Sequence, residues 1–445
     1  MKERIAATTL GCKVNQVETC SLLEAFKAQG YEVVPFKEKA DIYLINTCAV
    51  TARAAYESRQ LLRRALKNSP KLVIATGCYV QIGLEEIIEK IDHPLFLVGQ
   101  DQKAEIPNLI KKIELPLERN EIYVKPEVQL RQCIPFFFRR FYNHHRAFVK
   151  IQDGCNAFCS YCVVPYARGR ARSLPEDLVL QQIRLLKQEG YGEIVLTGIH
   201  LGWWGKDLSP PRNLLSLLKA VSKLHPPRIR LSSLNPEEIS PALLDFAAES
   251  RLICPHFHLS LQSLDNQVLK LMNRHYGLQE IEEVVWMIKE RFPNAALGAD
   301  IIAGFPGETE EAFGRTLEAL RRLPVDYLHV FPYSPRPGTK AAAMPQLPPH
   351  LVAQRAKALR ELARAKKKAF YHTQMGRSFE VLVQGYDDRQ NLYRGLTENY
   401  LTLYFSGPPG LEGQIVRVKG ERLVDECLYG RLENRSSLNL ASFTR

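Results

Sequence analysis

The stretch Asp153–Cys162, with the sequence DGCNAFCSYC, decides how the rest of the chain is interpreted. Its cysteines, Cys155, Cys159 and Cys162, have the spacing C-x3-C-x2-C and follow an apolar run typical of a strand, residues 147–151. Three thiolates do not complete a tetrahedral zinc site, and structural zinc sites normally use paired C-x2-C units. A [4Fe-4S] cluster has four irons, so three cysteines leave one iron open. The spacing therefore predicts an iron–sulfur cluster; the alternative is an adventitious zinc site or disulfide.

The overall composition is that of a globular protein with two or three domains. The chain has 445 residues, of which 45% are hydrophobic and 24% are charged, so a sizeable core can form. No run reaches the roughly 18 apolar residues of a membrane-spanning helix, and residues 5–10 are too short for a signal peptide core. Ten cysteines without a secretory signal indicate reduced thiols and metal binding. We therefore predict a cytoplasmic protein with no membrane segment.

Positive charge is in excess, with a formal net charge of +12, which suggests a polyanionic partner. Basic residues crowd around the central cysteine stretch: Arg131, Arg139, Arg140, Arg146, Lys150, Arg168, Arg170 and Arg172. A second run, residues 355–368, has seven Lys or Arg against the single acid Glu361. A solvated helix face explains this second run equally well, whereas the first run flanks the predicted cluster.

The N-terminal segment, residues 1–120, alternates strand-like runs, at residues 5–10, 42–45, 72–76 and 95–98, with helix-like stretches. This alternation predicts an open parallel α/β domain. Three cysteines in it follow predicted strands: Cys12 after residues 5–10, Cys48 after residues 42–45 and Cys78 after residues 72–76. Because the carboxyl ends of parallel strands meet at one edge of a sheet, we expect these cysteines to converge on one metal site. Three ligands again leave one iron open.

Ordinary burial is the alternative for any free cysteine. We interpret the cysteines without a neighbour at ligand spacing in this way: Cys20, Cys133, Cys254 and Cys427. Four histidines also lack ligand spacing, and structural roles are favoured for them: His200, His256, His258 and His329.

The central segment, residues 141–370, contains six strand-like runs, each followed by a helical stretch. The runs are residues 148–151, 194–197, 229–232, 258–261, 299–302 and 327–331. Six such units predict a partial (β/α)6 barrel. Its cysteine loop would follow the first strand at the carboxyl end, where barrels place their chemistry.

The C-terminal segment, residues 372–438, changes to five short β runs separated by turns rich in Gly and Pro, such as residues 406–410. Short strands at this spacing predict a small β-barrel of the OB-like kind. The whole chain is therefore expected to be α/β, with an open parallel domain, a partial barrel and a small β-barrel in that order.

The C-x3-C-x2-C stretch resembles that of the radical S-adenosylmethionine (SAM) enzymes. In that family the open iron of a [4Fe-4S] cluster binds SAM, which the reduced cluster cleaves to a 5′-deoxyadenosyl radical. Gly-Cys-Lys-Val-Asn at residues 11–15, Asn-Thr-Cys at 46–48 and Gly-Cys at 77–78 are similar to the methylthiotransferases. The resemblance implies a second, auxiliary [4Fe-4S] cluster on the N-terminal cysteines, and SAM contacts at Gly198 and Gly304.

Within that family the motifs are most similar to the MtaB type, which converts N6-threonylcarbamoyladenosine at tRNA position 37 to its 2-methylthio form. The C-terminal barrel resembles the TRAM domain, an RNA-binding module, which implies contact with the tRNA anticodon loop. The family also requires an external electron donor such as a flavodoxin or ferredoxin. Three alternatives stay open: MiaB-type action on isopentenyladenosine, RimO-type action on a ribosomal protein aspartate, and a non-catalytic RNA-binding metalloprotein.

Overall fold

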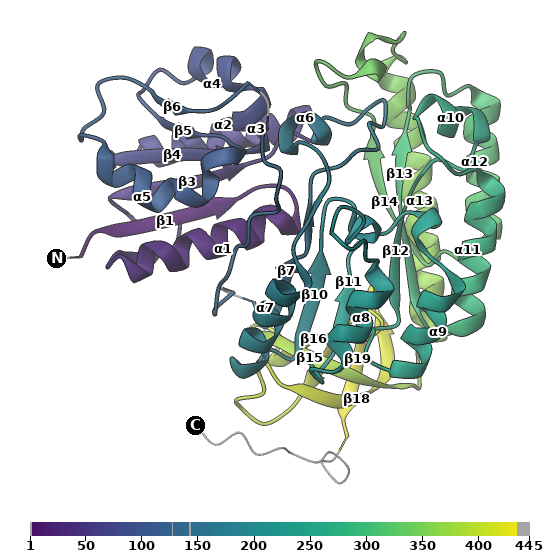
Figure 1. Cartoon of the computed structure of the whole chain (residues 1–445). Helices are drawn as coiled ribbons and strands as arrows, with labels where there is room; N and C mark the ends of the chain where they lie inside the picture. The colour runs from purple at the N-terminus through teal and green to yellow at the C-terminus, as the bar shows by residue number, and fades with distance from the viewer. Residues whose placement is uncertain (1, 127, 142–143, 434–445) are drawn as a thin grey trace.

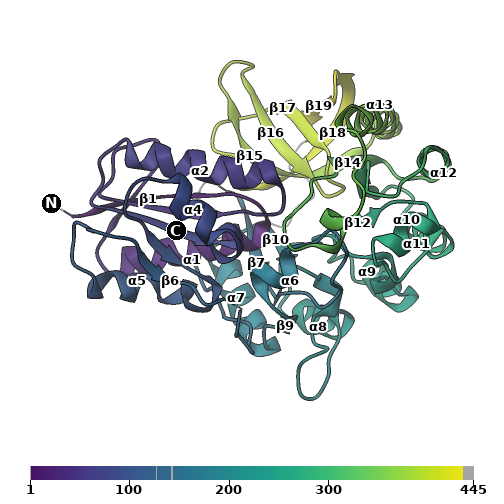
Figure 2. The ribbon, with the colours of Figure 1, turned by 90° about the horizontal axis from the view of Figure 1, so that it is seen from above.

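The computed structural model describes residues 2–126, 128–141 and 144–433. An N-terminal α/β unit lies beside a partial barrel, and a small closed β-barrel lies below the partial barrel (Figure 1). Seen from above, the N-terminal unit lies on the left, and the partial barrel and the small barrel lie beside it on the right (Figure 2). The α/β architecture predicted from the sequence is confirmed.

The N-terminal unit is a parallel sheet of six strands in the order β2-β1-β3-β4-β5-β6. Its strands are β1 (Arg4–Thr9), β2 (Glu32–Val34), β3 (Ile42–Thr47), β4 (Leu72–Gly77), β5 (Phe96–Val98) and β6 (Glu121–Tyr123). Its helices are α1 (Lys13–Ala28), α2 (Ala52–Leu66), α3 (Cys78–Ile82), α4 (Leu84–Lys90) and α5 (Ile106–Leu109). Every residue of β3 and β4 is buried, as expected for central strands of a parallel sheet.

Two strands of this sheet were not predicted. β2 is three residues long, and β6 follows residue 120, where the N-terminal segment was expected to end. Both are edge strands with half-exposed side chains. They therefore lack the continuous apolar run that identifies a buried strand in a sequence.

The partial barrel has six parallel strands, as predicted. They are β7 (Arg146–Lys150), β10 (Glu193–Thr197), β11 (Ile229–Leu231), β12 (His256–Gln262), β13 (Ala296–Ala303) and β14 (Tyr327–Pro332). The ladders β7-β10-β11 and β12-β13-β14 are joined by single bridges, Ile229 to Ile253 and Leu234 to Leu259. The following helices are α7 (Glu176–Gln188), α8 (Leu214–Ser222), α9 (Pro241–Ser250), α10 (Asn266–Leu271), α11 (Leu278–Arg291) and α12 (Glu310–Arg322).

A long helix, α13 (Pro349–Thr373), leads from the partial barrel into the small one. The small barrel closes in the order β15-β16-β17-β19-β18. Its strands are β15 (Ser378–Asp387), β16 (Leu392–Thr397), β17 (Thr402–Ser406), β18 (Ile415–Val424) and β19 (Cys427–Leu432). All five predicted strands are thus present, while residues 434–438 of the predicted segment lie outside the described residues.

Two arginines from the partial barrel hold the small barrel in place. Arg228 donates to the backbone carbonyls of Glu380 and Leu396, and Arg230 donates to those of Thr397 and Glu398. Both guanidinium groups are buried, so these hydrogen bonds satisfy donors that would otherwise be costly to bury. Among the helices of the described residues, none is long and apolar enough to cross a membrane.

Candidate functional site

The three N-terminal cysteines lie at the carboxyl ends of three neighbouring strands. Cys12 precedes α1 just beyond β1, Cys48 follows β3, and Cys78 begins α3 directly after β4. Electrostatic interactions connect every pair of the three thiols. The structure therefore brings these cysteines together at one edge of the sheet, as the strand arrangement predicts.

Two glycines allow the chain to pack closely around these thiols. Gly11 has a φ of +92°, and a Cβ at this position would lie 2.8 Å from the Cys48 sulfur. Gly77 has a φ of +101°, and its Cβ would lie 2.4 Å from the carbonyl oxygen of Thr47. Any side chain at either position would be strained by the backbone and would push into the cysteine site.

The environment of these thiols is apolar but has cations nearby. Burial raises the pKa of the Cys48 thiol to about 12 and also raises the pKa of Cys78. The buried cations Arg168 and Lys103 act in the opposite direction on Cys78. Cys48 and Cys78 are buried, whereas Cys12 is exposed. Positive charges beside these thiols suit the bound, deprotonated form, so the three residues fit an iron–sulfur cluster.

The second cysteine set lies on the loop after β7. A short antiparallel pair, β8 (Gln152–Asp153) and β9 (Arg172–Ser173), closes this loop, which also contains the helix α6 (Val164–Arg168). Gly154 starts the loop with a φ of +70°, and a Cβ there would lie 2.0 Å from the carbonyl oxygen of Arg170. The tight closure fixes the backbone that carries the three cysteines.

Each sulfur of this loop accepts a hydrogen bond. The donors are Ala157 N to Cys155 at 3.4 Å, Val164 N to Cys162 at 3.4 Å, and Arg274 Nη1 to Cys159 at 3.5 Å. Hydrogen bonds to cysteine sulfur stabilise thiolate ligands and tune the potential of a cluster. The loop therefore fits a thiolate-bound cluster, and Arg274 is a residue that the sequence did not identify.

His200, for which a structural role was expected, lies beside the same loop. Its Nδ1 is 3.4 Å from the Cys155 sulfur, and its Nε2 contacts Glu238 and Asn235. Although burial acts to lower it, the pKa of His200 rises to about 9 because of hydrogen bonds with Cys155 and Glu238. The sequence offered one indication, since His200 follows Gly198 by two residues.

The two glycines expected to contact SAM are both tightly packed. A Cβ on Gly198 would lie 3.0 Å from the side chain of Gln152, which itself donates to the carbonyl of Gly154 in the cysteine loop. Gly304 has a φ of +75°, and its Cβ would lie 2.7 Å from Val352 of α13. Gly198 thus lies near the cluster loop, and Gly304 packs against α13.

A buried network of charges connects the two cysteine sets. Glu18 of α1 lies at its centre, where Lys103 approaches to 2.7 Å, Arg168 to 3.0 Å and Lys150 to 3.4 Å. Arg168 also donates to Asp153, directly before the cysteine loop, at 2.8 Å. These cations hold the pKa of Glu18 well below its usual range, although burial acts to raise it. The network fixes α1 against the loop.

This network corrects one expectation about the basic residues around the cysteine stretch. Lys150, Arg168 and Arg172 are 4%, 1% and 3% exposed, so they pair with carboxylates and are not available to a polyanion. The exposed members of the group are Arg131, Arg139, Arg140 and Arg170.

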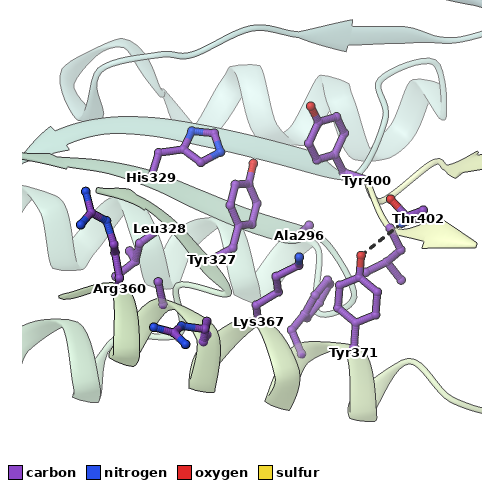
Figure 3. A pocket seen from close by; sticks show the side chains of 13 residues that line it. Ala296, Tyr327, Leu328, His329, Arg360, Lys367, Tyr371, Tyr400 and Thr402 are labelled. Carbon is purple, nitrogen blue, oxygen red and sulfur yellow. Dashed lines mark hydrogen bonds between the residues drawn. The ribbon is translucent and has the colours of Figure 1, made fainter. Parts of the chain in front are cut away.

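An open pocket of about 470 Å³ lies between β14, α13 and the small barrel (Figure 3). Its lining combines cationic and aromatic side chains: Tyr327, His329, Arg360, Lys367, Tyr371 and Tyr400. Figure 3 shows Arg360, Lys367 and Tyr371 rising from α13 toward the side chains of the two barrels. We call this the outer pocket; bases stack on aromatic rings and phosphates pair with such cations.

Comparison with known proteins agrees with this geometry. Residues 149–320 match the Radical SAM superfamily, and residues 4–99 match the Uncharacterized protein family UPF0004. The structure resembles the radical SAM methyltransferase TsrM from Kitasatospora setae, with a TM-score of 0.54, 16% identity, and coverage of 77% of this chain and 75% of that one. Fold and cysteine loop together define a radical SAM enzyme.

Curated relatives show to which group of radical SAM enzymes the chain is similar. Threonylcarbamoyladenosine tRNA methylthiotransferase MtaB of Aquifex aeolicus is 41% identical, covering 93% of this chain and 99% of the relative. MtaB of Bacillus subtilis is 36% identical, with 93% of each covered. A tRNA-2-methylthio-N(6)-dimethylallyladenosine synthase of Pelotomaculum thermopropionicum is 35% identical, covering 93% of this chain and 94% of the relative. The chain belongs to the MtaB-type methylthiotransferase family of radical SAM enzymes, and membership implies a [4Fe-4S] cluster and SAM.

Proposed function

We propose that this protein attaches a methylthio group to C2 of N6-threonylcarbamoyladenosine at position 37 of tRNA. The observation that carries the proposal is the presence of two separate three-cysteine sites in one molecule, joined by the buried network around Glu18. A simple electron carrier would use four cysteines for each cluster. The relatives named MtaB support the choice of substrate.

Two [4Fe-4S] clusters are proposed. Cys155, Cys159 and Cys162 would hold the one that binds SAM, and the auxiliary one would be held by Cys12, Cys48 and Cys78. When bound, the clusters and SAM supply radical hydrogen abstraction and the methylthio group, which acid–base chemistry cannot deliver to an unactivated adenine carbon.

The protein side chains then have three tasks. Arg274 and His200 contact the sulfurs of Cys159 and Cys155 and so orient the loop that carries the reactive centre. The network around Glu18 sets the position of α1, and with it Cys12, relative to that loop. Gly198 lets the backbone pack against Gln152 beside the cysteine loop, where we propose that it contacts the amino acid part of SAM.

The partner in this proposal is tRNA, bound through its anticodon loop. The outer pocket supports an RNA ligand because Arg360, Lys367 and Tyr371 place cations beside an aromatic surface. A flavodoxin or ferredoxin would supply the electron for SAM cleavage, and the reaction would take place in the cytoplasm.

Nucleoside mass spectrometry tests the proposal. tRNA from cells that lack their own methylthiotransferases and express this chain should contain 2-methylthio-N6-threonylcarbamoyladenosine, and a Cys159→Ala chain should give none. Appearance of the methylthiolated isopentenyladenosine would contradict the proposed substrate but not the proposed reaction. The 35% identical relative from Pelotomaculum supports this isopentenyladenosine activity as a second candidate function. Neither product, from protein shown to contain both clusters, would point to a protein substrate.

A further inference from the structure

A second cavity, of about 160 Å³, lies inside the partial barrel, and we call it the lumen cavity. Side chains from all three parts of the molecule line it, including Lys13, Arg146, Arg230, His256, Asp300 and Tyr400. Lys13 directly follows Cys12 in the chain. The cavity is thus lined by a residue adjacent to the N-terminal cysteine site. Tyr327, His329 and Tyr400 line both the lumen cavity and the outer pocket, and Figure 3 shows them in the outer pocket.

Positive charge exceeds negative charge around this cavity. Arg228 and Arg230 each lie 2.8 Å from the buried carboxylate of Glu193, and Arg146 lies 3.7 Å from it. One carboxylate cannot neutralise three guanidinium groups. Lys13 adds a fourth cation, and it has no ion-pair partner among the described residues. Lys13 and Arg146 are partly buried, and a partly desolvated surplus of cations favours the binding of an anion.

Several buried polar atoms at the cavity also make no hydrogen bond. Arg146 Nη1, Ser232 Oγ and His256 Nδ1 are buried atoms without a hydrogen-bond partner in the described part of the chain. All three residues line the lumen cavity. Buried polar groups are nearly always satisfied in folded proteins, so this concentration at one cavity indicates a ligand with several polar atoms.

One acceptor also faces the cavity. Asp300 lines it, and its carboxylate lies 3.5 Å from His258 Nε2 and 3.3 Å from His329 Nδ1. Burial lowers the pKa of His258 to about 4, so this histidine is neutral near pH 7 and does not act as a cation toward Asp300. The cavity lining thus combines cationic side chains with one carboxylate, which suits a ligand that has both an anionic group and a hydroxyl.

We propose that the lumen cavity binds the threonyl part of the substrate, with its carboxylate against Lys13 and Arg146 and its hydroxyl toward Asp300. This inference rests on the proposed function and names the residues that select the substrate. An isopentenyl group is apolar and would leave the same cations and donors unpaired, so the lumen cavity discriminates against it. Sites built to pair a polar group reject analogues that lack it far more strongly than apolar pockets reject extra atoms.

The test uses two anticodon stem-loop RNAs, one with N6-threonylcarbamoyladenosine and one with its uncharged carboxamide. Holoenzyme should methylthiolate the acid with a kcat/KM on the order of tenfold to a hundredfold above the carboxamide, because the carboxamide cannot form the charge-assisted hydrogen bonds. Arg146→Gln and Lys13→Gln should each bring this ratio toward one, mainly through KM for the acid. Arg146→Lys, which keeps the charge, should restore part of the preference.

Arg184→Gln is the matched control, since Arg184 is exposed on α7 and remote from the cavity lining. It should keep the full preference for the acid. Equal rates on both RNAs by the wild-type enzyme, or an unchanged preference in both Arg146→Gln and Lys13→Gln, would overturn the inference while leaving the proposed function intact. Failure of the wild-type holoenzyme to methylthiolate either RNA would overturn both.

Discussion

Substitutions of single cysteines should distinguish SAM cleavage from methylthiolation, the two reactions of the proposed function. Cys159→Ala should stop SAM cleavage, because the loop then keeps only two thiolates. Cys48→Ala should retain SAM cleavage but abolish methylthiolation, because only the N-terminal site loses a ligand. Mass spectrometry of 5′-deoxyadenosine and of the modified nucleoside checks both variants. Cys427→Ala, at a half-buried cysteine of the small barrel, is the control and should keep both activities.

The two variants should also differ from the wild type in iron content. Two cubane clusters predict about eight irons for the wild-type chain and about four for either variant. A Cys48→Ala protein that still methylthiolates would contradict the assignment of Cys48. Zinc alone in the reconstituted wild type would contradict the catalytic proposal.

Glu193 makes a pH-dependent contribution to stability. Burial acts to raise the pKa of Glu193, but Arg230 and Arg228 lower it to about 2, against about 4.3 in an unfolded chain. A lowered folded-state pKa stabilises the protein above the unfolded value, and the contribution is lost as the pH falls from about 5 toward 2. The difference corresponds to about 3 kcal/mol.

Glu193→Gln should therefore be strongly destabilised at pH 7, and its deficit in unfolding free energy should shrink between pH 5 and pH 3. Urea unfolding of cluster-free protein over this range measures the deficit. Glu249→Gln, at an exposed position of α9, should show no such change. A deficit that stays constant with pH would mean that the charge of Glu193 is not what stabilises this region.

At the scale of elements, α13 divides its basic run between two faces. Arg355 is buried and lies 2.7 Å from Glu308, whereas Arg360 is exposed and lines the outer pocket. Neither of the two sequence-based explanations, an RNA site or a solvated face, therefore applies to the whole run. Helical periodicity separates the residues that face the barrel from those that face the pocket.

Arg360→Glu should weaken RNA binding and reduce the steepness of its salt dependence by about one unit for each phosphate that the variant no longer neutralises. Fluorescence anisotropy with an anticodon stem-loop at several salt concentrations measures both quantities. Lys368→Glu is the matched control on the same helix, because Lys368 is exposed but does not line the outer pocket. Equal reductions in affinity for the two variants would mean that only the net charge of the protein matters. That result would contradict RNA binding at the outer pocket.

At the scale of the whole molecule, Glu18 connects the N-terminal unit to the barrel loop. Replacing it with Gln leaves Lys103 without a carboxylate partner among the described residues, whereas Lys150 and Arg168 keep Asp153. Breaking one partner of a buried charge network costs roughly 3–5 kcal/mol. Hydrogen exchange should consequently accelerate in α1 and in the cysteine loop of Glu18→Gln.

The control for this experiment is Glu57→Gln, since Glu57 forms an exposed pair with Arg53 on α2. Such a pair contributes at most about 1 kcal/mol. Unchanged exchange in α1 and the loop of Glu18→Gln would show that apolar packing alone joins the two parts.

The parts of this protein that depend on local spacing could be predicted from its sequence. The three cysteines Cys155, Cys159 and Cys162 lie within one loop, so their spacing identified the site. Buried strands were recognisable as apolar runs, and the carboxyl ends of parallel strands placed Cys12 and Cys48 at one edge of a sheet.

Which distant residues meet depends on the tertiary structure. His200 and Arg274 reach the cysteine sulfurs from other elements, and no spacing in the sequence relates them to the loop. The ion-pair partners of Arg168 likewise could not be predicted, because a sequence does not distinguish a buried, paired arginine from an exposed one. Burial and charge balance are properties of the packed molecule, and they identified the lumen cavity as the place where the substrate is selected.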